Sequence, residues 1–81
     1  MKYATVRAMA QDIKAKIDSY ISKDLSADEL YAFINDLMSI AENRKRVYKV
    51  KGYAVTITTV LGARMTIFDN ILKEIDAKRN G

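Results

Sequence analysis

The sequence predicts a small all-α domain of three to four helices, spanning residues 1–81 and opening with an N-terminal helical hairpin. Three observations predict this fold. Apolar residues recur every three or four positions over most of the chain, the period of a helix with one buried face. A complete helix-start motif stands at residues 26–29. The length of 81 residues is that of one domain with a small core.

The first helix is expected over residues 5–23. Thr5 can accept a hydrogen bond from the first turn as an N-cap. The apolar residues that follow share one face of the helix: Val6, Met9, Ile13, Ile17, Tyr20 and Ile21. This face predicts burial against a second helix.

The second helix, over residues 27–43, has the strongest local signal. Ser26 and Glu29 form a capping box, in which each side chain accepts from the backbone amide of the other residue. Leu25 and Leu30 occupy the hydrophobic-staple positions on either side. One broad apolar stripe then continues along the helix: Leu30, Phe33, Ile34, Leu37, Met38 and Ala41.

The stretch from Val47 to Leu61 fits two structures. Its β-branched residues and a turn at Lys51-Gly52 predict a hairpin over 47–59, which would make the fold α+β. Its apolar residues also fit a helical period that stays in phase with the rest of the chain. A lone two-stranded hairpin is marginally stable. We therefore favour a short helix over about 53–61 and keep the hairpin as the alternative.

Gly62 suits the end of that helix, where a positive φ costs glycine nothing. A last helix is then expected over 64–78. Lys73, Lys78 and Arg79 near its end complement the helix dipole.

The composition excludes most chemistry. The chain has no cysteine and no histidine, which removes disulfides, ordinary zinc sites, a thiol nucleophile and the most common general base. Its serines have no histidine to activate them, and its glycines form no nucleotide-binding loop. We expect a protein that is not an enzyme and has no cofactor or metal. No export signal or membrane span is evident, so we expect a cytoplasmic protein that does not engage a membrane.

Charge divides the chain into two halves. Residues 1–40 carry five Lys/Arg against six Asp/Glu, a net charge of −1, and residues 41–81 carry nine against four, a net charge of +5. The positive charge is concentrated between Asn43 and Gly52, where five cations alternate with one aromatic and two valines. Such a cluster is typical of a surface that meets a polyanion or an acidic protein. It is also typical of a solvated helix end, where cations favour the dipole and maintain solubility.

The candidate binding residues follow from this segment, 43–53, with Arg64 added as a neighbour through the turn at Gly62: Arg44, Lys45, Arg46, Tyr48, Lys49, Lys51 and Arg64. A protein partner, or a second copy of the chain, is the favoured ligand. Val47, Tyr48 and Val50 among the cations suit a protein interface, and arginine and tyrosine are enriched at such interfaces. Nucleic acid is the alternative, in which the cations contact phosphates.

A helix-turn-helix is one form of that alternative. The helices over 52–61 and 66–78 flank a glycine-containing turn, as that motif requires. The last helix would expose Asn70, Lys73 and Arg64 to DNA. It would also expose three carboxylates that repel phosphates, which counts against this interpretation: Asp69, Glu74 and Asp76.

Several short stretches carry a family resemblance over about residues 41–75. They are Ala41-Glu42-Asn43-Arg44, Val47-Tyr48-Lys49, Leu61-Gly62 with Arg64, Phe68 and Ile71-Leu72. In this order they resemble a small uncharacterised family of short proteins from Gram-positive bacteria and their phages or mobile elements. The chain departs from the pattern at Ala63, where the family suggests lysine. The resemblance implies a cytoplasmic or phage-related setting and supplies no activity.

Overall fold

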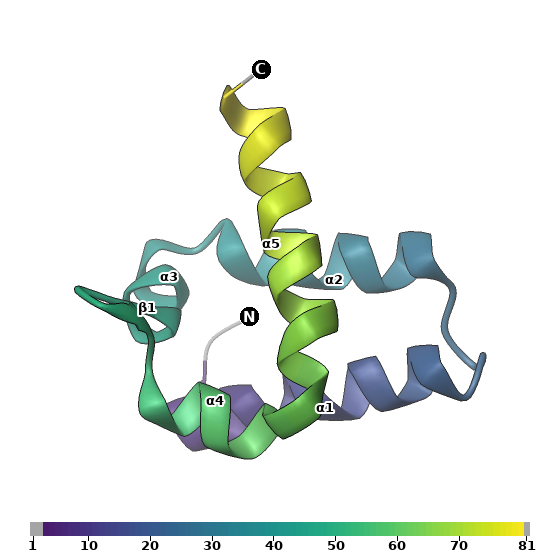
Figure 1. Cartoon of the computed structure of the whole chain (residues 1–81), viewed down its shortest axis with the longest axis horizontal. Helices are drawn as coiled ribbons and strands as arrows, with labels where there is room; N and C mark the ends of the chain where they lie inside the picture. The colour runs from purple at the N-terminus through teal and green to yellow at the C-terminus, as the bar shows by residue number, and fades with distance from the viewer. Residues whose placement is uncertain (1–2, 81) are drawn as a thin grey trace.

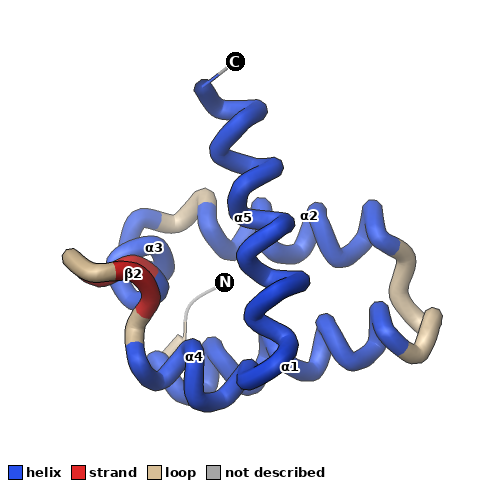
Figure 2. The backbone as a smooth tube through the Cα atoms, in the orientation of Figure 1, coloured by secondary structure: helices blue, strands red, loops and turns tan. Residues whose placement is uncertain are grey.

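Five α-helices and one very short hairpin make up the fold (Figures 1 and 2). The computed structural model describes residues 3–80. Along the chain, α1 (Val6–Ile21) and α2 (Ala27–Met38) are followed by α3 (Ala41–Val47) and the strands β1 (Tyr48–Lys49) and β2 (Gly52–Tyr53). The chain continues through α4 (Val55–Leu61), the 3₁₀ turn η1 (Gly62–Arg64) and α5 (Met65–Asn80). The predicted all-α class is confirmed.

The helical hairpin of α1 and α2 is also confirmed, and the predicted caps form its ends. The Thr5 hydroxyl accepts from the Ala8 amide at 3.0 Å. The Ser26 hydroxyl accepts from the Glu29 amide at 3.1 Å, and the Glu29 carboxylate accepts from the Ser26 amide at 3.0 Å. These hydrogen bonds lower the pKa of Glu29, because they favour its charged form.

The core lies where α1, α2, α4 and α5 meet. It includes Met9, Ile13 and Ile17 from α1, Leu30, Ile34 and Leu37 from α2, Ile57 and Leu61 from α4, and Phe68, Leu72 and Ile75 from α5. α1 packs most extensively on α4, and α5 crosses in front of both N-terminal helices in Figure 1. Two expected members are outside the core: Ile21 is 56% exposed at the end of α1, and Ala41 is exposed at the start of α3.

The expected helix over 27–43 is wrong in one respect, because it breaks at Ser39–Ile40. Ile40 has an extended backbone, and the helix restarts at Ala41 as α3. Side chains from α3 donate to carbonyls at the break, and the Leu37 carbonyl also accepts from the Ile40 amide at 3.4 Å. The Asn43 amide donates to the Leu37 carbonyl at 3.0 Å, and the Arg44 guanidinium donates to the Met38 carbonyl at 2.8 Å. Asn43 is 1% exposed, so its amide is buried between the end of α2 and α3.

The ambiguous stretch contains both of the structures that its sequence fits. Tyr48 pairs with Tyr53 and Lys49 with Gly52 in an antiparallel hairpin whose turn is Val50-Lys51. The chain then becomes helical at Val55, so the predicted helix is confirmed over 55–61 and the hairpin is confined to 48–53. Gly62 ends α4 with a φ of +56°, as its position predicts.

Candidate functional site

The basic segment 43–53 divides into residues that face the protein and residues that face solvent. The inward set is Asn43, Arg44, Arg46 and Val47. Arg46 donates to the Tyr3 carbonyl at 2.6 Å and lies 3.3 Å from the Glu42 carboxylate. Val47 is 0% exposed. Two of the five predicted cations and one of the two valines are therefore engaged in holding the fold, and the expectation that Val47 is an interface residue is wrong.

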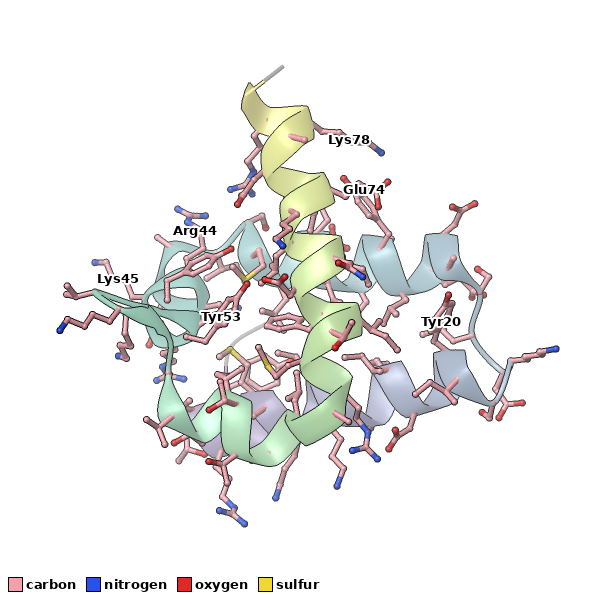
Figure 3. All side chains as sticks on the ribbon, viewed as in Figure 1. Tyr20, Arg44, Lys45, Tyr53, Glu74 and Lys78 are labelled. Carbon is pink, nitrogen blue, oxygen red and sulfur yellow. The ribbon has the colours of Figure 1, made fainter. Side chains whose placement is uncertain are left out.

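The outward set is Lys45 and the hairpin tip, Lys49–Lys51 (Figure 3 labels Lys45). Val50 is 103% exposed at the apex of the turn, between two exposed lysines. The Lys49 ammonium donates to the Lys45 carbonyl at 3.4 Å, and neither Lys45 nor Lys51 forms an ion pair with any residue of 3–80. The outward set thus presents one apolar side chain among three ammonium groups that have no carboxylate partner in the described chain.

The base of the hairpin is attached to α5 by aromatic rings. Tyr48 stacks on Tyr53 with ring centroids 5.7 Å apart, and Tyr53 meets Phe68 at 6.2 Å. The Tyr53 hydroxyl donates to the Asp69 carboxylate. Burial, this hydrogen bond and the nearby carboxylates raise the pKa of Tyr53 far above its ordinary value, while the same bond and Lys73 lower the pKa of Asp69. Tyr53 therefore anchors the hairpin.

Tyr48, the aromatic residue of the predicted site, is partly accessible, with 37% of its surface exposed. Burial raises its pKa, and the carboxylates of Asp76 and Asp69 on α5 add to that effect. Its ring is already occupied on the side that stacks on Tyr53. It therefore cannot offer two open ring faces to a partner.

Arg64 is not brought to the basic segment. It lies in η1, at the opposite end of α4 from the hairpin (Figure 1). Its guanidinium pairs with Asp18 of α1 and also reaches the Leu61 carbonyl. These contacts connect the α4–α5 turn to α1, so the predicted proximity through Gly62 is wrong.

A second feature is a hollow of about 240 Å³ at the junction of α1, α2 and α5. Its lining residues are Tyr20, Ala27, Leu30, Tyr31, Ile67, Asn70, Ile71 and Glu74. At its edge the Lys78 ammonium lies 4.5 Å from the centre of the Tyr31 ring and 3.8 Å from the Glu74 carboxylate. The sequence does not reveal this hollow, because its apolar members follow the same helical period as the core and no local pattern distinguishes them.

The described residues contain no group of three or more acidic side chains placed to share a metal ion. Within residues 3–80 no helix is long and apolar enough to span a bilayer. The arrangement can form contacts with another surface at the hairpin tip and can admit a small group at the hollow.

A family model described as "Conserved hypothetical protein", and named after a Clostridium gene, matches residues 1–73. The chain belongs to this family. The match extends the family resemblance from the C-terminal half of the chain to the N-terminal hairpin, and the family is a bacterial one whose description names no activity. Comparisons with curated proteins and with solved structures found no match.

Proposed function

We propose that this protein is a non-enzymatic binding protein that engages a protein partner through its hairpin tip, Lys49–Lys51, with Lys45 beside it. The observation that carries the proposal is the full exposure of Val50 between two lysines. Burial of a valine at the apex of a projecting turn under a partner stabilises the complex, because it removes apolar surface from water. The flanking ammonium groups favour a partner whose contact surface is acidic around an apolar centre.

The distribution of exposed apolar residues supports this choice. Among residues 3–79, the large exposed hydrophobic residues are Ile21, Tyr48, Val50 and Val55, and three of these four lie in or directly after the hairpin. Scattered exposed apolar residues need no explanation, but a group within eight positions of the chain favours an interaction surface.

Nucleic acid remains the second candidate, supported by the three outward lysines. Two findings count against it. Arg44 and Arg46 are engaged with backbone carbonyls, which leaves fewer cations for phosphates. On α5, which a helix-turn-helix would use for recognition, Lys73 pairs with Asp69 and Lys78 with Glu74. Contact of the exposed valine with a solvated phosphate backbone would also bury little of its apolar surface and so add little to binding.

The setting is part of the same proposal. We propose a cytoplasmic setting in the bacterial cell, and the bacterial family to which the chain belongs supports the bacterial part of this proposal. An association with phages or other mobile elements rests on the family resemblance alone.

Site-specific photo-crosslinking in the producing cell tests the proposal. A photoreactive amino acid replaces Val50 in one variant and Ala15, an exposed residue of α1, in the control. We expect a discrete protein adduct from position 50 that is absent from position 15. Adducts that contain nucleic acid instead would favour the second candidate, and equal labelling from both positions would contradict the assignment of the tip.

Salt dependence separates the two candidates in vitro. If the three outward lysines each contact a phosphate, the logarithm of the nucleic-acid binding constant should fall against log[salt] with a slope of about −2.7. The control is Lys45→Gln/Lys49→Gln/Lys51→Gln, which leaves the inward arginines and the fold in place. Tight binding to duplex or single-stranded nucleic acid that this variant abolishes would overturn the protein-partner proposal.

A further inference from the structure

The hollow between α1, α2 and α5 combines an apolar floor with a carboxylate at its edge. Leu30, Ile67 and Ile71 supply the floor, and Glu74 is one of its walls. Its volume of about 240 Å³ lies below the range of about 300–1,000 Å³ in which drug-sized ligands bind. The hollow is therefore suited to one or two side chains of another protein better than to an organic cofactor.

The protein already places an ammonium group at this edge. The Lys78 ammonium lies over the Tyr31 ring and beside the Glu74 carboxylate, so an aromatic face and a negative charge converge there. The side chain of Lys78 is 65% exposed, so this lysine covers the edge without filling the hollow. An incoming lysine can bind to the same pair of groups when its ammonium takes the place of the exposed Lys78 ammonium.

The charges of the two regions are complementary. α2 lines the hollow with Ala27, Leu30 and Tyr31, and its first turn carries Asp28 and Glu29. The hairpin tip carries two lysines and an exposed valine. An apolar side chain between two cations matches an apolar floor that has the Glu74 carboxylate at its edge.

The two regions lie on opposite sides of the molecule. In Figure 3 the hollow's Tyr20 is on the right and Lys45, next to the hairpin, is on the left, with α5 between them. The tip of a chain therefore faces away from the hollow of the same chain, so a tip can enter only the hollow of another molecule.

We propose that the hollow receives the hairpin tip of a second copy of this chain, with Val50 against the apolar floor and a flanking lysine at Glu74. This inference rests on the proposed function of the tip as a protein-binding element and names its partner. Because tip and hollow are different surfaces, the contact is head to tail. Such contacts close into rings or extend into open chains, and they do not stop at a two-fold dimer unless two copies close on each other.

Complementary variants test the inference by sedimentation, from about 10 μM to about 1 mM, because contacts below about 1,200 Å² are weak. Val50→Asp disables the tip and leaves the hollow intact. Glu74→Lys disables the hollow and leaves the tip intact. Asp36→Lys, which makes a comparable change of charge at an exposed position of α2 outside the lining of the hollow, is the matched control. Circular dichroism confirms that each variant is folded.

We expect the wild type and the control to associate increasingly with concentration, and each disabled variant alone to remain a monomer. An equimolar mixture of the two disabled variants retains one intact tip and one intact hollow, so it should form a heterodimer of twice the monomer mass and nothing larger. This result is specific to a head-to-tail contact, since tip-to-tip association would leave Glu74→Lys as associated as the wild type.

Several results would overturn the inference. These are a wild type that stays monomeric throughout, a Val50→Asp variant that still associates, or a mixture that forms no heterodimer. If Glu74→Lys associates as strongly as the wild type while Val50→Asp stays monomeric, the hollow is not the site that receives the tip. The tip would still be a protein-binding element. Crosslinking at position 50 decides the proposed function independently, because it detects any protein partner.

Discussion

Within the eleven residues of segment 43–53, the inward set has two arginines and a valine and the outward set has three lysines and a valine, but the two sets have opposite roles. Arg44 and Arg46 hold backbone carbonyls from α2 and the N-terminus, while Lys45 and the tip lysines project into solvent. Val47 is fully buried, and Val50, three residues later, is fully exposed. A charge cluster is therefore a mixture of structural and free groups, and only the free groups are evidence for binding.

The division follows side-chain chemistry. A guanidinium group has five donors in a rigid plane and is weakly hydrated, so it can remain at a carbonyl in a half-buried position. An ammonium group is strongly hydrated and is stabilised in water. The arginines at the break between α2 and α3 and the lysines at the turn match these preferences.

The largest difference in stability between the inward and outward sets is expected from the same substitution at their two valines. Val47→Ala removes two buried methyl groups and leaves a cavity, so it should lower the free energy of unfolding by about 2–3 kcal/mol. Val50→Ala removes the same atoms from water-exposed positions and should change it by less than about 0.5 kcal/mol. Urea denaturation of both variants measures the difference. Similar losses from the two would mean that the hairpin tip is packed in solution.

A second pair compares neighbouring cations. Arg44→Ala removes the donor to the Met38 carbonyl at the end of α2, and should cost about 1 kcal/mol because the group is only half-buried. Lys45→Ala loses no hydrogen bond from its side chain and should stay within about 0.5 kcal/mol of the wild type. Thermal unfolding of both proteins gives the comparison. An equal cost would show that the Arg44 contact contributes nothing to stability.

Much of the fold was accessible from local sequence, and the exceptions are informative. The capping box of Ser26 and Glu29 and the positive φ of Gly62 depend on residues within one turn, so sequence predicts them. The break at Ser39–Ile40 depends on Asn43 and Arg44 reaching back to carbonyls six residues earlier. Ser39 and Glu42 have capping-box spacing, but this box does not form: Ile40 is the N-cap of α3, without a side-chain cap, and the Ser39 hydroxyl donates to the Asp36 carbonyl.

The site was harder to predict for the same reason. Sequence located the basic segment but could not separate its two sets, because the partners of Arg46 and Tyr53 are distant: Tyr3 lies 43 residues from Arg46, and Asp69 lies 16 residues from Tyr53. The hollow joins α1, α2 and α5, and its residues share the helical period of the core. Long-range packing decided each of these features.

A smaller effect is expected at the anchor of the hairpin. Tyr53→Phe removes the hydrogen bond to Asp69 and should cost about 0.5–1 kcal/mol at pH 7. The pKa of Tyr53 is raised by burial and by Asp69, so the stabilisation is complete below the ordinary tyrosine pKa of 10.0. Above that pH the unfolded chain loses the proton while the folded protein keeps it, and stability falls.

Urea titrations at pH 7 and above pH 10 measure this effect. The wild type should lose stability more steeply than Tyr53→Phe as the pH rises, because the variant lacks the group whose pKa is shifted. At acid pH the contribution of the Tyr53–Asp69 pair depends on Asp69. Because the pKa of Asp69 is lowered, the pair stabilises the protein above the ordinary aspartate pKa, and this stabilisation is lost as the pH falls. Parallel alkaline curves for the two proteins would contradict the anchoring role.

The smallest change in stability is expected from the outward lysines, and its sign is informative. Lys45→Gln/Lys49→Gln/Lys51→Gln removes three like charges that have no carboxylate partner among residues 3–80. Relief of their mutual repulsion should stabilise the protein slightly, by up to about 0.5 kcal/mol at low ionic strength. The gain should vanish at about 1 M salt, where the Debye length is about 3 Å. Urea denaturation at the two salt concentrations measures it. A clear loss of stability would instead place these lysines in the inward set, whereas a stable variant that no longer crosslinks at position 50 would separate binding from folding within one segment.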